Sequence, residues 1–257
     1  MLTFDKVLLK FGGLSAINDL SFHVQEGQIF SLIGPNGAGK TTVFNCINRL
    51  YTPSSGSITF NGQNLLESKA HQIIHLGIAR SFQNVELFSK MSVMDNLLTG
   101  LHPHIKKNLL SIAFNLPSVR ATEREARKKA EEILDILGLS DLAKEEVVNL
   151  PFGYQKMVDI GRALIAKPKL LLLDEPVAGM NPTETENLGK LIVRLKEEMN
   201  ITVLLIEHDM SLVMNVSDYI TVMNFGKKIA EGLPHEIQNN PEVIEAYLGE
   251  GESIAVT

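Results

Sequence analysis

The segment from Gly34 to Thr42 limits what this chain can fold into more than any other part of it. It reads Gly-Pro-Asn-Gly-Ala-Gly-Lys-Thr-Thr, which fits the pattern GxxxxGK followed by Ser or Thr. The apolar residues 28–33 come directly before it, and residues 41–50, which read as a helix, come at its end. A strand, a glycine-rich turn and a helix in this order predict a phosphate-binding loop, whereas a glycine-rich turn met by chance would lack both neighbours.

The residue types of this loop suit a bound nucleotide. Glycines allow the backbone to curl so that successive N–H groups face an anion, and the following helix adds its positive end. Lys40 is predicted to reach the β and γ phosphates, Thr41 to give its hydroxyl to Mg²⁺, and Thr42 to contact the α phosphate. The predicted nucleotide contacts of the loop are Gly34, Pro35, Asn36, Gly37, Ala38, Gly39, Lys40, Thr41 and Thr42.

A second motif joins an apolar run to two carboxylates. Residues 170–173 are four leucines, followed by Asp174 and Glu175. The run predicts a buried strand, and ligands bind at the carboxyl edge of parallel strands. Asp174 is predicted to orient Mg²⁺ and Glu175 to polarise water. An acidic pair after a strand is otherwise a helix cap or a solvated turn, but the presence of Lys40 in the same chain favours the functional interpretation.

Hydrophobic patterning predicts an α/β protein that forms one continuous unit with a helical insertion. Short strands dominate residues 2–60, helices dominate 85–150, and helices then alternate with strands, as in a parallel sheet with helices on its faces. Segments predicted as strands are 7–11, 17–24, 28–33, 57–60, 170–173, 201–206 and 219–223, with a turn at Asn61-Gly62. Segments predicted as helices are 121–139 with Gly138 as C-cap, 161–166, 182–198 and a stretch from Asp209.

Composition limits the setting in which the chain works. A formal net charge of −6 disfavours a nucleic-acid binder, which has to neutralise phosphates. The single cysteine, Cys46, excludes an intramolecular disulfide, and the first residues lack the features of a signal peptide. Apolar runs are shorter than the roughly 18 to 20 residues of a membrane helix. We therefore expect a cytoplasmic protein that reaches a membrane only through a partner.

Further elements of the sequence resemble the ABC ATPase family. They are Gln83 within SFQNVELF, a signature-like LPFGYQ at Leu150–Gln155, and His208 in IEHDM. The resemblance covers nearly the whole chain and implies the ABC type of P-loop NTPase fold, with a mainly parallel core sheet, an antiparallel β subdomain and a helical subdomain. It implies that residues 1–84 and 156–257 form the catalytic core with the β subdomain, and that 85–155 form the helical subdomain with the signature.

The resemblance also implies roles for single residues. Phe11 would stack on adenine, Gln83 would sense Mg²⁺ and the attacking water, and His208 would contact the γ phosphate. Each residue alone would be more typical of a core, surface or structural position. The signature would cap the γ phosphate held by an opposing subunit, through Pro151, Phe152, Gly153 and Tyr154.

This signature departs from the common LSGGQ form. Pro151 stands in the place of serine, Phe152 in that of the first glycine and Tyr154 in that of glutamine. The segment that is usually SALD reads Ala-Gly-Met-Asn at 178–181. The departures leave open how active the composite site completed by this chain is.

The motifs LPxGxQ, AGxNPxET and NPEVIEAYLGE are similar to the LivG type of ATPase in branched-chain amino-acid importers. The long interval between Gln83 and Gly153 favours this type over the related LivF type. The implied activity is binding and hydrolysis of ATP with Mg²⁺, which powers uptake of these amino acids or a related small solute.

The implied partners are a second ABC ATPase subunit of the same or another sequence, a separate membrane permease and, indirectly, a solute-binding protein, but no nucleic acid. The implied location is the cytoplasmic face of the membrane. Urea, amide or lipid transport stays open. An ATPase acting on nucleic acid or ribosomes would need a second such domain or a long coiled coil, and a regulatory module without hydrolysis disagrees with the presence of Glu175 and His208.

Overall fold

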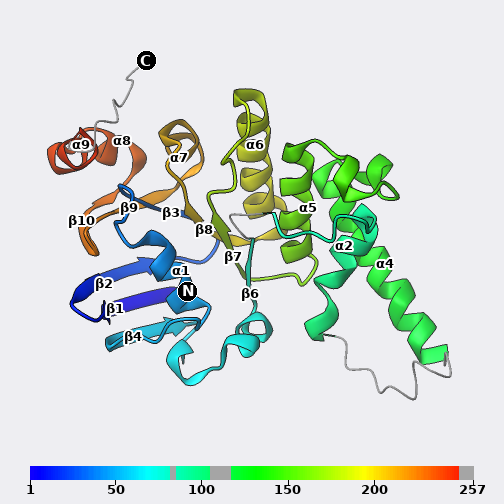
Figure 1. Ribbon diagram of the computed structural model, residues 1–257, viewed down its shortest axis with the longest axis horizontal. Coiled ribbons are helices and arrows are strands. Elements are labelled where there is room, and N and C mark those ends of the chain that lie inside the picture. The colour runs from blue at the N-terminus through cyan, green and yellow to red at the C-terminus, as the bar shows by residue number, and fades with distance from the viewer. Residues whose placement is uncertain (82–84, 105–116, 249–257) are drawn as a thin grey trace.

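The computed structural model describes residues 1–81, 85–104 and 117–248, and its strands form two sheets (Figure 1). The strands are β1 (Leu2–Phe11), β2 (Leu14–Val24), β3 (Ile29–Ile33), β4 (Ser55–Phe60), β5 (Gln63–Asn64), β6 (Ile78–Arg80), β7 (Leu170–Asp174), β8 (Thr202–Ile206), β9 (Tyr219–Asn224) and β10 (Lys227–Gly232).

The smaller sheet has the strand order β2-β1-β4-β5, and its neighbouring strands are antiparallel. Asn61 and Gly62 connect β4 to β5, and their φ angles of 49° and 79° are both positive, as a two-residue type I′ turn requires. The turn predicted from this Asn-Gly pair is therefore confirmed.

The larger sheet has the order β10-β9-β3-β8-β7-β6. The pairs β9–β3, β3–β8, β8–β7 and β7–β6 are parallel, and β10 returns antiparallel to β9. This confirms the predicted core sheet with helices between its parallel strands.

Both faces of this core sheet are covered. Along β7, Leu170 and Leu172 belong to a hydrophobic cluster that contains Phe44, while Leu171 and Leu173 belong to a cluster on the other face. The first cluster also takes in residues of β1, β2 and β4, so the helix that bears Phe44 lies between the two sheets. Coverage of both faces explains why β7 reads as an unbroken apolar run.

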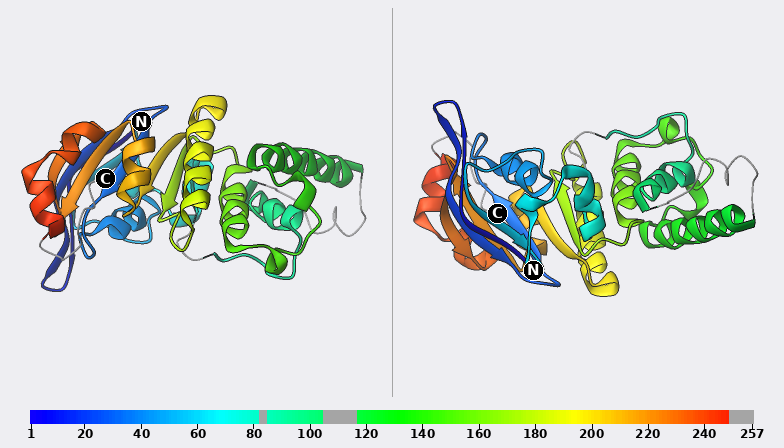
Figure 2. Two further views of the ribbon diagram at one scale, coloured as in Figure 1. Left: turned by 90° about the horizontal axis from the view of Figure 1, so that it is seen from above. Right: turned by 90° about the horizontal axis from the view of Figure 1, so that it is seen from below.

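Three helices, α2, α4 and α5, pack on one another and form a group at one end of the molecule (Figure 2). The α-helices are α1 (Lys40–Ile47), α2 (Val93–Thr99), α4 (Pro117–Leu137), α5 (Phe152–Leu164), α6 (Pro182–Met199), α7 (Met210–Val216), α8 (Pro234–Gln238) and α9 (Pro241–Leu248). The short 3₁₀ helices are η1 (Leu65–Glu67), η2 (Ala70–Leu76), η3 (His102–His104), η4 (Ser140–Leu142) and η5 (Val147–Asn149). Within the described residues, no helix has both the length and the apolar character to cross a membrane.

Candidate functional site

Three loops meet at the carboxyl edge of the core sheet. β3, β8 and β7 are parallel neighbours, so the chain leaves all three strands at the same edge. The phosphate loop follows Ile33, Asp174 ends β7, and His208 comes shortly after β8. Three motifs that are far apart in the sequence therefore come together at the edge where parallel sheets bind ligands.

The phosphate loop has a backbone that requires glycine at two positions. Gly34 has φ 148° and Gly39 has φ 102°, both in the region that side chains disfavour. A Cβ atom at Gly34 would overlap the carbonyl oxygen of Met223, and one at Gly39 would overlap that of Ala16. The loop is thus held between β9 and β2, and its glycines are needed for this close approach as well as for the curl of the backbone.

Lys40 opens α1 and lies across its own loop. Its ammonium donates to the carbonyl oxygens of Gly34 at 2.6 Å and Pro35 at 3.0 Å, and the residue is 7% exposed. These bonds hold the Lys40 ammonium at the loop, beside the N-terminus of α1, where an anion is favoured.

Asp174 is buried at the end of β7, with 1% of its surface exposed. Its Oδ2 accepts from the Arg80 guanidinium at 2.6 Å, whereas its Oδ1 has no hydrogen-bond partner among the described residues. Burial raises the pKa of this carboxyl, and the bond from Arg80 acts in the opposite direction. A buried carboxylate oxygen left without a partner fits Mg²⁺, which takes hard oxygen ligands and is usually held by one or two carboxylates together with substrate phosphates.

Glu175 has an unusual backbone conformation. Its φ is 46°, in the left-handed region, and its N–H donates to the carbonyl oxygen of Ile206 at 2.8 Å. Its Oε2 lies 3.9 Å from Nδ1 of His208, and the Glu175 side chain is 19% exposed. The structure therefore brings the two residues together from the ends of β7 and β8.

Glu207 was not predicted from the sequence. It is fully buried, and its carboxylate accepts the backbone N–H groups of Val177 at 3.0 Å, His208 at 3.0 Å and Asp209 at 3.3 Å. Burial raises its pKa, against the effect of these three donors. Glu207 joins the loops that follow β7 and β8, and an acidic residue between an apolar strand and His208 was the signal that could have identified it.

Phe11 ends β1 and is 46% exposed. Its ring meets that of Tyr51 edge to face, with centroids 5.1 Å apart and planes at 76°. With this contact in place the residue keeps nearly half of its surface exposed, and stacking on adenine would need such an accessible ring.

The signature residues open α5. Pro151 is the N-cap, Phe152 and Tyr154 are exposed, and Gly153 is buried. A Cβ atom at Gly153 would lie 2.9 Å from Oε1 of Glu184, so the start of α5 closely approaches the first turn of α6 at this glycine. In Figure 1, α5 lies on the opposite side of β7 from α1, so the chain's own signature does not join its phosphate loop. Gln83 lies outside the described residues.

Lys156 is another buried cation that the sequence did not reveal. It is 2% exposed, and its ammonium lies 5.7 Å from the centre of the Phe152 ring. Burial lowers its pKa, and the carboxylates of Asp159 and Glu207 act in the opposite direction. The Lys156 ammonium thus lies beside Phe152 of the signature segment.

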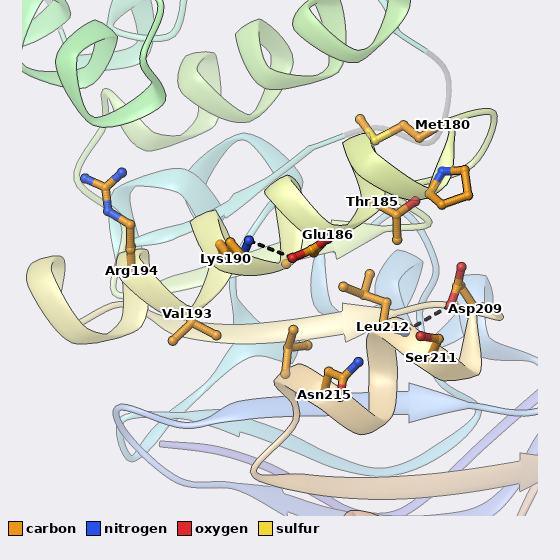
Figure 3. A pocket seen from close by; sticks show the side chains of 13 residues that line it. Met180, Thr185, Glu186, Lys190, Val193, Arg194, Asp209, Ser211, Leu212 and Asn215 are labelled. Carbon is orange, nitrogen blue, oxygen red and sulfur yellow. Dashed lines mark hydrogen bonds and ion pairs between the residues drawn. The ribbon is translucent and has the colours of Figure 1, made fainter. Parts of the chain in front are cut away.

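A groove of about 940 Å³ lies between α6 and α7 (Figure 3). An ion pair of 2.6 Å between Lys190 and Glu186 forms part of its wall, and Asp209, which caps α7 by accepting from the Leu212 N–H at 2.9 Å, lies at one end. The residues that line the groove do not include the phosphate loop. The groove therefore lies apart from the loop, and the candidate nucleotide site is placed by the chemistry at the strand ends.

Comparison with protein families agrees with this geometry. Residues 17–178 match the family model described as ABC transporter, which covers more than half of the chain. Residues 227–253 match the model described as branched-chain amino acid ATP-binding cassette transporter.

Individual relatives extend the likeness over nearly the whole length. The chain is 46% identical to the high-affinity branched-chain amino acid transport ATP-binding protein BraF of Pseudomonas aeruginosa, over 94% of this chain and 95% of the relative. It is 45% identical to the LivG protein of Escherichia coli, described in the same words, over 97% of this chain and 98% of the relative.

A solved structure shows the same fold. The ADP conformation of MJ1267, an ATP-binding cassette of an ABC transporter, superposes with a TM-score of 0.85 at 32% identity, over 97% of this chain and 98% of that one. The matching loops at one sheet edge, the family model and these relatives lead to one conclusion. The chain belongs to the ABC transporter family and has the fold of its ATP-binding cassettes.

Proposed function

We propose that this chain binds ATP with Mg²⁺ at the carboxyl edge of the core sheet and hydrolyses it to energise the import of branched-chain amino acids. The observation that carries the proposal is the meeting of Lys40, Asp174, Glu175 and His208 at that edge, in a chain 45–46% identical to ATP-binding proteins of branched-chain amino acid transport.

Each residue has a defined task in this proposal. Lys40 and the N-terminus of α1 bind the β and γ phosphates, and Asp174 with the Thr41 hydroxyl would hold Mg²⁺, which offsets negative charge on the phosphates. Glu175 orients the attacking water and accepts its proton, and His208 contacts the γ phosphate beside it. Such a site works by positioning and charge stabilisation, since phosphoryl transfer needs little covalent chemistry from the protein. Gln83 is proposed to assist at the metal and the water.

The working assembly is part of the same proposal. Two ABC ATPase subunits would enclose ATP, with Pro151–Tyr154 of this chain facing the nucleotide of the other subunit. A membrane permease would dock on the helical part, 85–155, and a solute-binding protein would deliver the solute to the permease, so the chain would act at the cytoplasmic face of the membrane. The other part, 1–84 with 156–257, is proposed as the catalytic core. The boundary runs through α5, which packs against α2 and α4 of the helical part and against β6 of the core.

Substitution of Lys40 by alanine tests the nucleotide site. The loss of hydrogen bonds to a charged phosphate is expected to weaken ATP binding by about 1.5 to 3 kcal/mol, which is tenfold or more in Kd. Binding is measured by calorimetric titration, and Lys144→Ala, which removes an exposed lysine of the helical part, is the control. Equal affinity of Lys40→Ala and the native chain would refute the site.

The solute is tested in vesicles that contain the complete transporter. Leucine, isoleucine or valine with the solute-binding protein is expected to stimulate ATP hydrolysis by the assembled complex. If urea or an amide stimulates hydrolysis instead, the assignment of branched-chain amino acids as the solute is wrong, whereas the proposed nucleotide site is not affected.

A further inference from the structure

Arg80 contacts two elements of the nucleotide site at once. It ends β6, beside β7, and its side chain is 10% exposed. One guanidinium nitrogen, Nη2, donates to Asp174 Oδ2 at 2.6 Å, and the other, Nη1, donates to Oδ1 of Asn45 at 2.9 Å. The guanidinium carbon lies 5.5 Å from the centre of the Phe44 ring. A single side chain thus connects the end of β7 to α1.

The two connected elements carry the two predicted Mg²⁺ ligands that the structure describes. Asp174 is one of them, and Thr41 is the other. Asn45 follows Thr41 by four positions on α1, so the two side chains lie on one face of the helix, one turn apart. The bond between Arg80 and Asn45 therefore fixes the helix face that presents Thr41 relative to the carboxylate of Asp174.

The contact also determines which Asp174 oxygen is available. Arg80 occupies Oδ2 and leaves Oδ1 without a hydrogen bond among the described residues. Arginine suits this position because its planar guanidinium reaches two acceptors while its face lies on an aromatic ring. A lysine has a compact charge on a flexible stem and cannot make the same set of contacts.

We propose that Arg80 is a positioning residue for Mg²⁺, which holds Asp174 and the Thr41 helix at the spacing that the metal requires. This inference rests on the proposed function, because it concerns the Mg²⁺ that accompanies ATP. It adds a residue of β6 to the metal site, although Arg80 itself contacts neither the metal nor the nucleotide.

The experiment compares the Kd of ATP in excess Mg²⁺ with that in EDTA. Their ratio measures what the metal adds to binding, and no turnover enters the measurement. In Arg80→Ala this ratio is expected to fall by about tenfold or more, the usual effect of removing the partner of a metal ligand. Binding in EDTA is expected to stay as in the native chain, since Lys40 and the loop are untouched. Arg80→Lys is expected to restore only part of the ratio.

Arg49→Ala is the matched control. Arg49 follows α1, is half-buried, and donates to the carbonyl oxygens of Ser68 and Leu66, away from the sheet edge. Its loss removes a guanidinium of the same kind and is expected to leave the ratio unchanged.

The outcomes separate the two levels of the proposal. An unchanged ratio in Arg80→Ala, or an equal loss of affinity with Mg²⁺ and with EDTA, would overturn the positioning role. If Arg80→Ala fails to fold, Asn45→Ala keeps the ion pair with Asp174 and breaks only the connection to α1, and an unchanged ratio there would overturn the proposal as well. A native chain that binds no ATP would overturn the proposed function itself, before any substitution is considered.

Discussion

Glu175 shows how a single residue can be placed against its own preference. A non-glycine residue with φ 46° costs of order 1 to 3 kcal/mol unless its surroundings impose the conformation. The imposing contact is the bond from its N–H to Ile206 on the neighbouring strand. The result is a carboxylate turned out of the line of β7 and toward His208.

Glu175→Gln is expected to stop hydrolysis while preserving binding. Glutamine keeps the shape and the hydrogen bonding of the side chain but cannot accept a proton, and loss of a general base typically lowers a rate by about 10²- to 10⁴-fold. ATP should then be trapped in a closed dimer. Rapid-quench measurement of phosphate, together with sizing of the complex in ATP, checks both parts. A variant that hydrolyses ATP at the native rate would exclude Glu175 as the base.

Phe11→Ala is expected to weaken ATP binding by about 1 to 3 kcal/mol, the range for stacking of a base on an aromatic ring. Phe11→Tyr should be nearly neutral, because tyrosine offers the same ring face. Phe88→Ala removes another exposed phenylalanine, from the segment before α2, and serves as the control. Should Phe11→Ala bind ATP as tightly as the control, Phe11 has only a packing role against Tyr51.

Some residues of the candidate site can be recognised from their neighbours in the sequence, and others only from partners that are distant in the sequence. Lys40, Asp174 and His208 could be predicted because each directly follows a recognisable strand or lies in a motif. Arg80 could not, since its partner Asp174 is 94 positions away and the pairing arises only when β6 and β7 become neighbours. Glu207 likewise bonds to Val177, 30 positions away.

At the scale of elements, the sequence predicts most clearly where capping and periodicity agree. The predicted helix 182–198 is observed as α6, Pro182–Met199, and it begins with a capping box in which Asn181 and Glu184 bond to each other's backbone N–H groups. Proline at its first position adds to the signal.

Where local signals conflict, the prediction was less complete. The strand predicted at 7–11 is the second half of β1, which begins at Leu2. Lys6 has φ 47°, and the pairing with β2 shifts register between Phe4 and Val7. This irregularity interrupts the alternation of buried and exposed residues that reveals a strand, so only the part beyond it was recognised.

The helix predicted at 161–166 is likewise the end of a longer one. α5 starts at Phe152, directly after Pro151, and ends at Leu164. Gly153 and Gly161 lower its helix propensity, but both lie where α5 closely approaches another element: a Cβ atom at Gly161 would lie 2.6 Å from Cδ1 of the buried Leu137. Contacts with other elements, which the sequence does not display, outweigh the local preference.

Glu207→Gln is expected to lower the free energy of unfolding by about 1 to 3 kcal/mol, because an amide presents a donor to one of the three N–H groups that the carboxylate accepts. Urea unfolding of the native chain and the variant gives the difference, with the exposed Glu145→Gln as control.

The same pair of proteins tests the pKa of Glu207. Because burial raises this pKa above its ordinary value of 4.5, the folded chain holds the proton more tightly than the unfolded chain. The resulting stabilisation is complete below the ordinary value and is lost as the pH rises through the folded one. The advantage of the native chain over the variant should therefore shrink as the pH rises from 4.5. If the stability difference between the native chain and the variant grows with pH instead, the three backbone N–H donors lower the pKa of Glu207 by more than burial raises it.

At the scale of the whole molecule, the phosphate loop and the signature segment lie apart within the chain. Figure 1 shows α1, which follows the phosphate loop, and α5 on opposite sides of β7, and this arrangement favours the proposal that the signature acts on a nucleotide held by another subunit. If the partner is a distinct ATPase, the site with Lys40 and Glu175 is completed by the partner's signature. Pro151 and its neighbours then complete the partner's site.

Of the two composite sites, the partner's site is the one where Pro151→Ser is expected to change hydrolysis. A serine hydroxyl bound to the γ phosphate would contribute about 1.5 to 3 kcal/mol as a charge-assisted contact. Serine would also cap α5, which has no side-chain cap, and stabilise the chain by about 0.5 to 2 kcal/mol. Single-turnover hydrolysis in the reconstituted transporter, with each site disabled in turn, measures the effect at each site, and urea unfolding of the isolated chain measures the effect of the cap. Equal rates at both sites of the native complex, or full activity of this chain as a homodimer, would contradict the asymmetric assembly.

The clamping of the phosphate loop between two sheets has a mechanical consequence. Gly226 donates its N–H to Ala38 of the loop at 2.9 Å and accepts the N–H of Asn18 at 2.8 Å, so one turn of the core sheet fastens the antiparallel sheet and the loop together. Because both hydrogen bonds belong to the same residue, a shift of one sheet relative to the other would disturb the backbone of the loop at Ala38. The turn at Gly226 therefore links the relative position of the two sheets to the shape of the phosphate loop.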